Sequence, residues 1–402
     1  MLIFPISFLL IARKQKTEKF LINGIIISLP LSFINIFGGD YGSLPLSWYN
    51  LFCVGYILNG LLKRECNTTG KQIGIMLLCT FIVSTLFSYD FSISIKSLLT
   101  TSLTCLVMIV FWKTYFPTKY SKEDLLEFGR QFITATCSTA AVMLFFKIIW
   151  MRGIVFESSG IMDAGVGRVG NKFLFSDYSF ISVFLAIGAT YCFFFPFNRK
   201  WKQIVLPALL LLACIDTTAR SGFAALLIFG VFFLSKKILL QSSARYALLL
   251  IPLAVGAFFI IHQLSSRRDG QSMIDGSGRI ENMKIAVPVI RENFLLGVGP
   301  GAKVYQNYVV NMHGVVNHYE IPHNIVFQSL AYYGCIGFLV LSVFFLYLFR
   351  NCENNPESKA FYVCMFGSLF IPDIFVSRFF LVIVILMWIS KDCGVLKNYD
   401  NH

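Results

Sequence analysis

Long apolar runs recur along almost the whole chain, and this recurrence limits the possible folds more than any other feature. A membrane-spanning helix needs about 20 mainly apolar residues. A soluble domain carries about 25% charged residues, whereas this chain is 14% charged and 56% hydrophobic. The pattern therefore predicts an all-α, polytopic integral membrane protein with about 12 transmembrane helices. The runs are residues 2–12, 20–37, 45–62, 73–88, 98–116, 131–150, 173–197, 203–217, 223–235, 246–261, 325–349, 360–371 and 379–390.

Basic residues predict which side of the membrane each connection occupies. Of the 34 lysines and arginines, 21 lie in alternate connections between the apolar runs. Because cytoplasmic connections are enriched in Lys and Arg, we assign these connections to the cytoplasm. This bias also accounts for the net charge of +13 without nucleic-acid binding. The assignment is the same whether or not residues 2–12 cross the membrane, which the sequence leaves open.

One long polar segment falls on the opposite, outer side. We predict a single transmembrane domain over residues 1–402, with residues 262–322 inserted as a long outer loop between two transmembrane helices. ATP is not available outside the cytoplasmic membrane. Any chemistry at this loop must therefore use a substrate that is already activated, or a gradient.

The middle of the loop has helical periodicity followed by glycines. Ile280, Met283 and Val287 recur at helical spacing, which predicts an amphipathic helix that begins near Ser277. The run Gly297–Gly301 should end it. That run lacks the Lys-Ser/Thr of a phosphate-binding loop, so we predict a turn.

Two short turns outside the loop carry charges at helix ends. Arg220 lies in the turn Thr217–Gly222, where it can contact an anion or extend to the membrane interface. Asp373 and Arg378 lie between two short apolar runs. They can pair with each other, or Arg378 can be a second anion ligand. Charges in such places are functional candidates.

A histidine follows the long loop directly. Pro322 favours the start of a helix, so His323 and Asn324 are predicted in its first turn. A neutral imidazole there can act as a general base, or it can be a hydrogen-bonded interfacial histidine. His313 and His318 are alternative bases within the loop.

In this order, these clusters resemble the O-antigen ligase and polymerase superfamily of bacterial envelope glycosyltransferases. The resemblance covers roughly residues 205–380. Its motifs are Thr217–Gly222, Gly278 with Arg279, Arg291–Gly301, Pro322–Asn324, Tyr333–Gly337, and the pair Asp373 and Arg378.

The resemblance implies a GT-C-like membrane enzyme in the bacterial inner membrane with its active site facing the periplasm. The enzyme would be inverting, would need no metal and no cofactor, and would act on undecaprenyl-pyrophosphate-linked glycans. His323 would be the base, and Arg220, Arg279 and Arg378 would bind the pyrophosphate. Supporting roles would fall to Arg291, Asn324, Asp373 and His318. The partners would be the lipid-linked donor and acceptor, membrane lipid and a chain-length regulator protein.

The physics of the reaction agrees with this resemblance. Guanidinium groups bind pyrophosphate through paired hydrogen bonds, and the sequence has no Asp-x-Asp motif to hold a metal ion. The loop, its exit and the two turns would have to meet over one groove at membrane level, with the loop as its lid.

Three alternatives follow from the same residues. We favour a polymerase over a ligase because the stretch Arg291–Gly301 is more similar to polymerases. A flippase or transporter would carry charges in mid-membrane helices and two related halves, whereas Lys147 is the exception here. A structural or receptor role would not need the arginines. The sequence does not give the sugar, the linkage, the chain length or the oligomeric state.

Overall fold

The computed structural model describes the chain in two compact units. The first unit comprises Met1–Ala135, Glu281–Asn355 and Pro372–His402, and the second comprises Thr136–Ile280 and Pro356–Ile371. We describe each unit by itself. The described residues are 16–36, 46–61, 63, 68–114, 120–153, 162–163, 170–171, 177–241, 279–314, 321–371 and 373–392.

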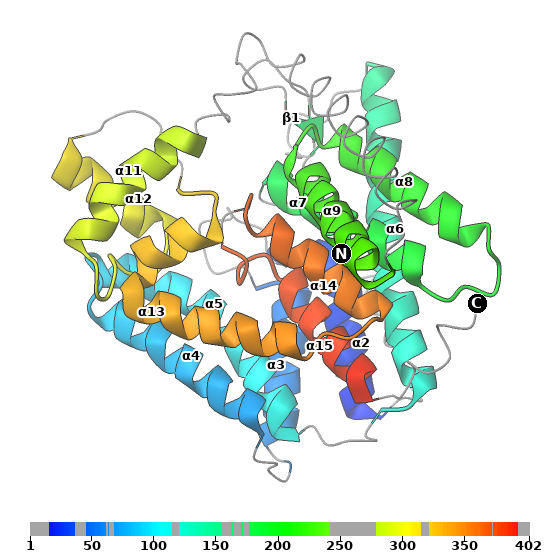
Figure 1. Ribbon diagram of the computed structural model, residues 1–402, viewed down its shortest axis with the longest axis horizontal. Coiled ribbons are helices and arrows are strands. Elements are labelled where there is room, and N and C mark those ends of the chain that lie inside the picture. The colour runs from blue at the N-terminus through cyan, green and yellow to red at the C-terminus, as the bar shows by residue number, and fades with distance from the viewer. Residues whose placement is uncertain are drawn as a thin grey trace. The chain divides into compact units, whose positions relative to one another are not determined.

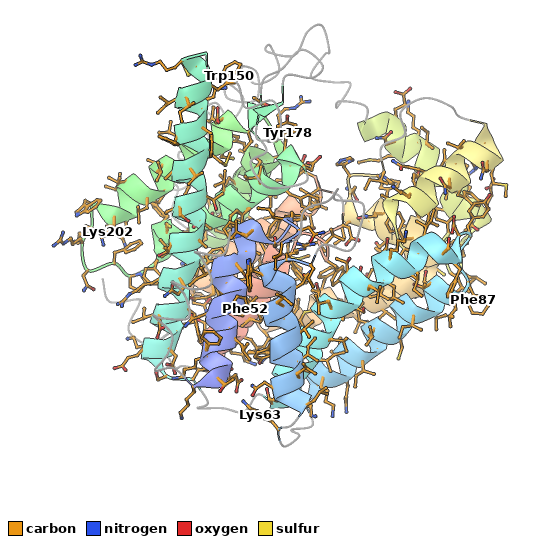
Figure 2. All side chains as sticks on the ribbon, turned by 180° about the vertical axis from the view of Figure 1, so that it is seen from behind. Phe52, Lys63, Phe87, Trp150, Tyr178 and Lys202 are labelled. Carbon is orange, nitrogen blue, oxygen red and sulfur yellow. The ribbon has the colours of Figure 1, made fainter. Side chains whose placement is uncertain are left out.

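The first unit is built on three long helices. Of these, α4 (Thr69–Leu86) packs against both α5 (Phe91–Thr114) and α13 (Ile325–Arg350) (Figure 1). The ring of Phe52 meets Phe20 edge-on at 5.9 Å, where α3 packs against α2 (Figure 2). The remaining elements are α2 (Thr17–Ser28), η1 (Leu29–Leu31), α3 (Trp48–Leu61), the first half of α6 (Lys122–Met151), α11 (Arg279–Glu292) from Glu281 onward, α12 (Ala302–His313) and α15 (Phe379–Asp392).

The second unit is organised around α7 (Tyr178–Phe194), which packs against three other helices. Because of this central position, α7 is buried over almost its whole length. Its Tyr191 hydroxyl donates a hydrogen bond to Glu357 at 2.9 Å, so a buried carboxylate is matched. The other elements are the rest of α6, α8 (Lys202–Asp216), α9 (Ser221–Gln241), α14 (Pro356–Gly367) and the antiparallel pair β1 (Met162–Asp163) and β2 (Gly170–Asn171).

The apolar runs that fall within the described residues form helices, as predicted. Within the described part of the chain, α4, α5, α6 and α13 are long and apolar enough to cross a membrane. Large apolar side chains lie exposed on them, including Phe145 at 59% and Leu339 at 62%. Such surfaces fit a lipid environment better than water. The number of about 12 spans stays a prediction, because residues 2–12 and 246–261 lie outside the described residues.

Charged residues join several connections at one end of the first unit. Lys19 pairs with Asp124, and Lys63 pairs with Glu18. Lys391 donates a hydrogen bond to the Asn351 side chain at 2.7 Å. These basic residues all come from connections that the charge count assigned to one side. Figure 2 shows Lys63 near the start of α4 and Phe87 at its opposite end.

Candidate functional site

The entrance to α13 carries the predicted base. The helix begins at Ile325 and not at Pro322, so His323 and Asn324 precede the first turn and do not form it. Asn324 is the N-cap, because its side-chain oxygen accepts hydrogen bonds from Val326 N at 2.9 Å and Phe327 N at 3.4 Å. The expected position was wrong because an extended Asn cap, rather than the proline, starts the helix.

The orientation of His323 determines which of its nitrogens is basic. Its Nδ1 lies 2.9 Å from the carbonyl oxygen of Ile321, and the side chain is half-buried. Because a carbonyl oxygen can only accept, Nδ1 must carry the proton. In the neutral ring, Nε2 is then the nitrogen that can take up a proton. This tautomer suits a general base.

The turn Asp373–Arg378 is held by helices from three directions. Gln328 of α13 accepts a hydrogen bond from Asp373 N at 2.8 Å. Thr104, about midway along α5, donates to the carbonyl of Phe375 at 3.3 Å. Tyr49 of α3 donates to the carbonyl of Arg378 at 3.2 Å. The turn therefore lies part-way down the long helix α5 and not at its tip.

Arg378 is buried, with 2% of its surface exposed. Its guanidinium carbon lies 4.4 Å from the centre of the Phe33 ring and 5.8 Å from that of Tyr49. The structure shows no ion pair between Arg378 and Asp373, although both residues are described. Stacking uses the face of a guanidinium, whereas anions bind in its plane. The aromatic contacts are thus compatible with an anion ligand.

Burial changes the acidity of Asp373. Loss of solvent raises the pKa of this carboxyl to about 6, although hydrogen bonds from Phe375 N and Val376 N oppose the rise. Asp373 can therefore change charge near neutral pH.

The side chains of the turn Thr217–Gly222, in the second unit, hold the turn in place through hydrogen bonds and close packing. The Thr217 hydroxyl donates to the carbonyl of Cys214 at 2.7 Å and accepts from Ala219 N at 3.2 Å. The Ser182 hydroxyl accepts from Gly222 N at 3.0 Å, and a Cβ on Gly222 would lie 2.4 Å from the Ser182 carbonyl oxygen. These contacts fix the turn against α7, so the half-buried Arg220 projects from a rigid support.

Lys147, the charge within a predicted span, has a partner beside this turn. Its Nζ lies 3.4 Å from Asp216 Oδ1 and 4.9 Å from the centre of the Trp150 ring. Asp216 ends α8, four residues before Arg220. Pairing with Asp216 lowers the cost that a lone lysine would have within a predicted span.

The glycine run packs against a break in α13. Gly334 has φ +64° and ψ −169°, which interrupts the helix. Val298 N donates to the carbonyl of Ala331 at 2.9 Å, and Cys335 N donates to that of Phe294 at 2.7 Å. We call residues 295–301 the glycine loop. Its φ angles of +71°, +103° and +123° at the three glycines confirm the predicted turn. The main-chain groups named here bind α13, so they are not presented to a phosphate.

The structure has a helix, α11, where the sequence predicted one, and a second helix, α12, was missed. Tyr308 of α12 donates to Glu292 Oε2 at 2.8 Å, and His313 Nε2 lies 3.3 Å from the same oxygen. The His313 ring therefore lies beside a carboxylate, without a hydrogen bond to it. Arg291 is exposed in the last turn of α11. The Arg279 side chain and the whole of His318 lie outside the described residues.

Two of the predicted clusters lie within the first unit and are linked through Gln328. Gln328 joins the helix that follows His323 to the turn of Asp373 and Arg378, while Arg220 belongs to the second unit. Sequence reasoning missed Gln328, although its spacing of one helical turn from Asn324 was a usable signal.

Backbone strain marks the same turns. Among the described residues, positive φ at non-glycine positions occurs at Thr218 (+59°), Asp373 (+32°) and Arg378 (+63°). Such strain is often associated with functional sites. No three His, Cys, Asp or Glu side chains in the described ranges are grouped closely enough to hold a metal ion.

Comparison with known proteins agrees with these motifs. Residues 205–342 match the family model described as O-antigen ligase. The matched stretch contains Arg220, Arg279 and His323 and ends before Asp373. No curated protein matches the chain. The match implies a membrane glycosyltransferase-like enzyme and supports placing the chain in the O-antigen polymerase and ligase superfamily.

Proposed function

We propose that the protein is an O-antigen polymerase of the bacterial inner membrane. It joins undecaprenyl-pyrophosphate-linked oligosaccharide repeat units into long O-polysaccharide at the periplasmic face. The observation that carries this proposal is the family match over residues 205–342, which includes His323 and two of the three arginines. The buried Gln328 contact adds support, because it brings the helix after His323 and the Arg378 turn into one unit.

The chemistry assigns one step to each group. The acceptor hydroxyl oxygen bonds to the anomeric carbon of the donor while the bond from that carbon to the pyrophosphate oxygen breaks. The hydroxyl proton moves to His323 Nε2, and the bonding electron pair leaves with the pyrophosphate. Attack opposite the leaving group inverts the anomeric centre.

The leaving group explains the arginines. We assign the pyrophosphate to Arg220, Arg279 and Arg378, because guanidinium groups stabilise its developing charge through paired hydrogen bonds. Arginines can do this without a metal ion. Transfer needs no nucleotide either, because the lipid pyrophosphate is already activated. A chain-length regulator protein would act on the same growing polymer.

Ligation is the second candidate, because the match to a family model described as O-antigen ligase does not distinguish the two reactions. A ligase would transfer the finished lipid-linked chain to lipid A-core with the same base and arginines. Deletion of the gene distinguishes the two on a lipopolysaccharide gel. Core plus one repeat indicates a lost polymerase. Core without a repeat, together with accumulated lipid-linked polymer, indicates a lost ligase.

Single arginine substitutions test the assigned roles. Arg220→Ala, Arg279→Ala and Arg378→Ala should each abolish chain extension at normal protein levels, because each removes part of the pyrophosphate site. Arg350→Ala is the matched control, since Arg350 is exposed in the last turn of α13 at the opposite end from His323. Long-chain polysaccharide in all three variants would refute the pyrophosphate assignment.

A further inference from the structure

One side chain makes the connection between the predicted base and the strained turn. Gln328 is four residues after the N-cap Asn324, so it lies on the same face of α13 one turn further along. Only 4% of its surface is exposed. Its Oε1 accepts the hydrogen bond from Asp373 N, across 45 residues of sequence.

Stability alone does not explain a glutamine at this position. Its Nε2 is buried and makes no close hydrogen bond to a residue that the structure describes, although the Tyr332 side chain one turn further along lies beside it. A buried amide with one unmatched end costs free energy that an apolar residue would avoid. Its Oε1, however, accepts a hydrogen bond from the N–H of Asp373, whose φ is +32°. At such a backbone angle the N–H has no partner from a regular helix or strand, so a side chain must provide one.

We infer that Gln328 is a positioning residue, which fixes Asp373 and the turn of Arg378 relative to the helix end that carries His323. The inference rests on the proposed glycosyl transfer. It sets the separation between the base and Arg378, although Gln328 itself touches no substrate.

Two other hydrogen bonds hold the turn, so a substitution of Gln328 should affect only the part of the turn near Asp373. Thr104 and Tyr49 bind the carbonyls of Phe375 and Arg378, so these two contacts remain when Gln328 is changed. Removing the Gln328 acceptor should therefore release Asp373 without unfolding the rest of the turn.

Two substitutions at Gln328 separate positioning from packing. Gln328→Met keeps the length of the side chain and removes the acceptor, whereas Gln328→Glu keeps an acceptor oxygen. Gln203→Met is the matched control, because Gln203 donates a hydrogen bond to the carbonyl of Phe195 at 3.1 Å in the other unit. Each variant is produced in a deletion strain, and polymer formation on its accumulated lipid-linked repeat units is followed in isolated membranes.

A misplaced group can lower a rate by about 10²-fold. At equal protein amounts we expect a loss of that size for Gln328→Met, a rate within about tenfold of wild type for Gln328→Glu, and no change for Gln203→Met. Equal rates for Gln328→Met and Gln203→Met would overturn the inference. So would an equal loss in Gln328→Met and Gln328→Glu, because the acceptor oxygen would then not matter.

Hydrogen exchange of the purified full chain gives a readout that does not depend on activity. The Asp373 amide should exchange faster in Gln328→Met than in wild type or Gln328→Glu. Unchanged exchange overturns the positioning role even if activity is lost. The Asp373 amide could exchange faster in Gln328→Met while wild-type membranes make no polymer. That result would refute the proposed polymerase activity but would establish the contact between Gln328 and Asp373.

Discussion

Asp373 combines three properties in one residue. Its backbone lies in the left-handed region, its N–H is bound by Gln328, and burial raises the pKa of its carboxyl to about 6. A carboxylate kept in such a place destabilises the fold when it is charged. The residue is therefore better explained by a function than by stability.

The pH dependence of stability should reveal this carboxyl. Because its folded pKa is raised from 3.8 to about 6, its stabilising contribution is complete below pH 3.8 and is lost as the pH rises through 6. Asp373→Asn should therefore gain about 1–3 kcal/mol relative to wild type between pH 4 and pH 8. Thermal unfolding of the purified protein across this range measures the difference. A difference that does not vary with pH would contradict the raised pKa.

At the residue scale, the sequence predicted which charged residues are unusual better than it predicted which residues they contact. Asp373 and Arg378 were recognised as charges beside apolar runs, and both lie in the strained turn. Their partners could not be predicted, because Gln328 and Phe33 are distant in sequence and no periodicity links them to the turn. Lys147 was noted as an exception, but Asp216 was not recognised as its partner.

At the scale of elements, α13 is two helical segments that meet at Gly334. The glycine loop fills the break, since its carbonyls and amides pair with groups on both sides of it. Ser84 of α4 adds a hydrogen bond to the Tyr332 carbonyl at 2.8 Å. The resulting support determines the direction of the segment that begins at Ile325, and therefore where His323 lies.

Alanine at Gly334 should disrupt this support. A Cβ there would lie 2.3 Å from the Leu295 carbonyl oxygen, in addition to the cost of φ +64°. Gly314→Ala is the control, because Gly314 has φ +62° and a Cβ added to it would meet no atom within 4 Å. The left-handed backbone costs about 1–2 kcal/mol at Gly314, whereas the ψ of −169° at Gly334 lies in a region that is essentially restricted to glycine, which adds to the loss there. Gly334→Ala should lose clearly more stability in thermal unfolding, and equal losses would show that the close approach is unimportant.

Helices were predictable where their periodicity was strong. The runs 73–88 and 325–349 became α4 and α13 with small shifts at their ends, whereas the run 98–116 became α5, which begins earlier, at Phe91. The helix α12 was missed although Val304, Tyr305 and Tyr308 recur at helical spacing and Gly314 ends the pattern. The interruption of α13 could not be predicted, because one glycine inside an apolar run is common in membrane helices.

At the scale of the whole molecule, the two ends of the first unit carry different kinds of connection. Ion pairs gather the basic connections at one end, and the α4–α5 connection lies at the other. This arrangement agrees with the alternation found by counting Lys and Arg, and the proposal places the α4–α5 end in the periplasm.

Thiol labelling tests that orientation in intact cells. In a background with the native cysteines replaced by serine, Ser92→Cys at the start of α5 should react with a membrane-impermeant maleimide. Glu123→Cys, exposed at the start of α6, should react only after the cells are permeabilised. The reverse pattern would place His323 in the cytoplasm and exclude a periplasmic polymerase.

The pairing of the glycine loop with the α13 break also limits how such chains can be recombined. Gly297 approaches the Tyr332 main chain and Gly334 approaches the Leu295 main chain, so each segment is shaped to the other. A graft that introduces a foreign glycine loop without the α13 it packs against would lose this close main-chain packing. Loop exchange between related enzymes should therefore use residues 295–336 as the smallest transferable block.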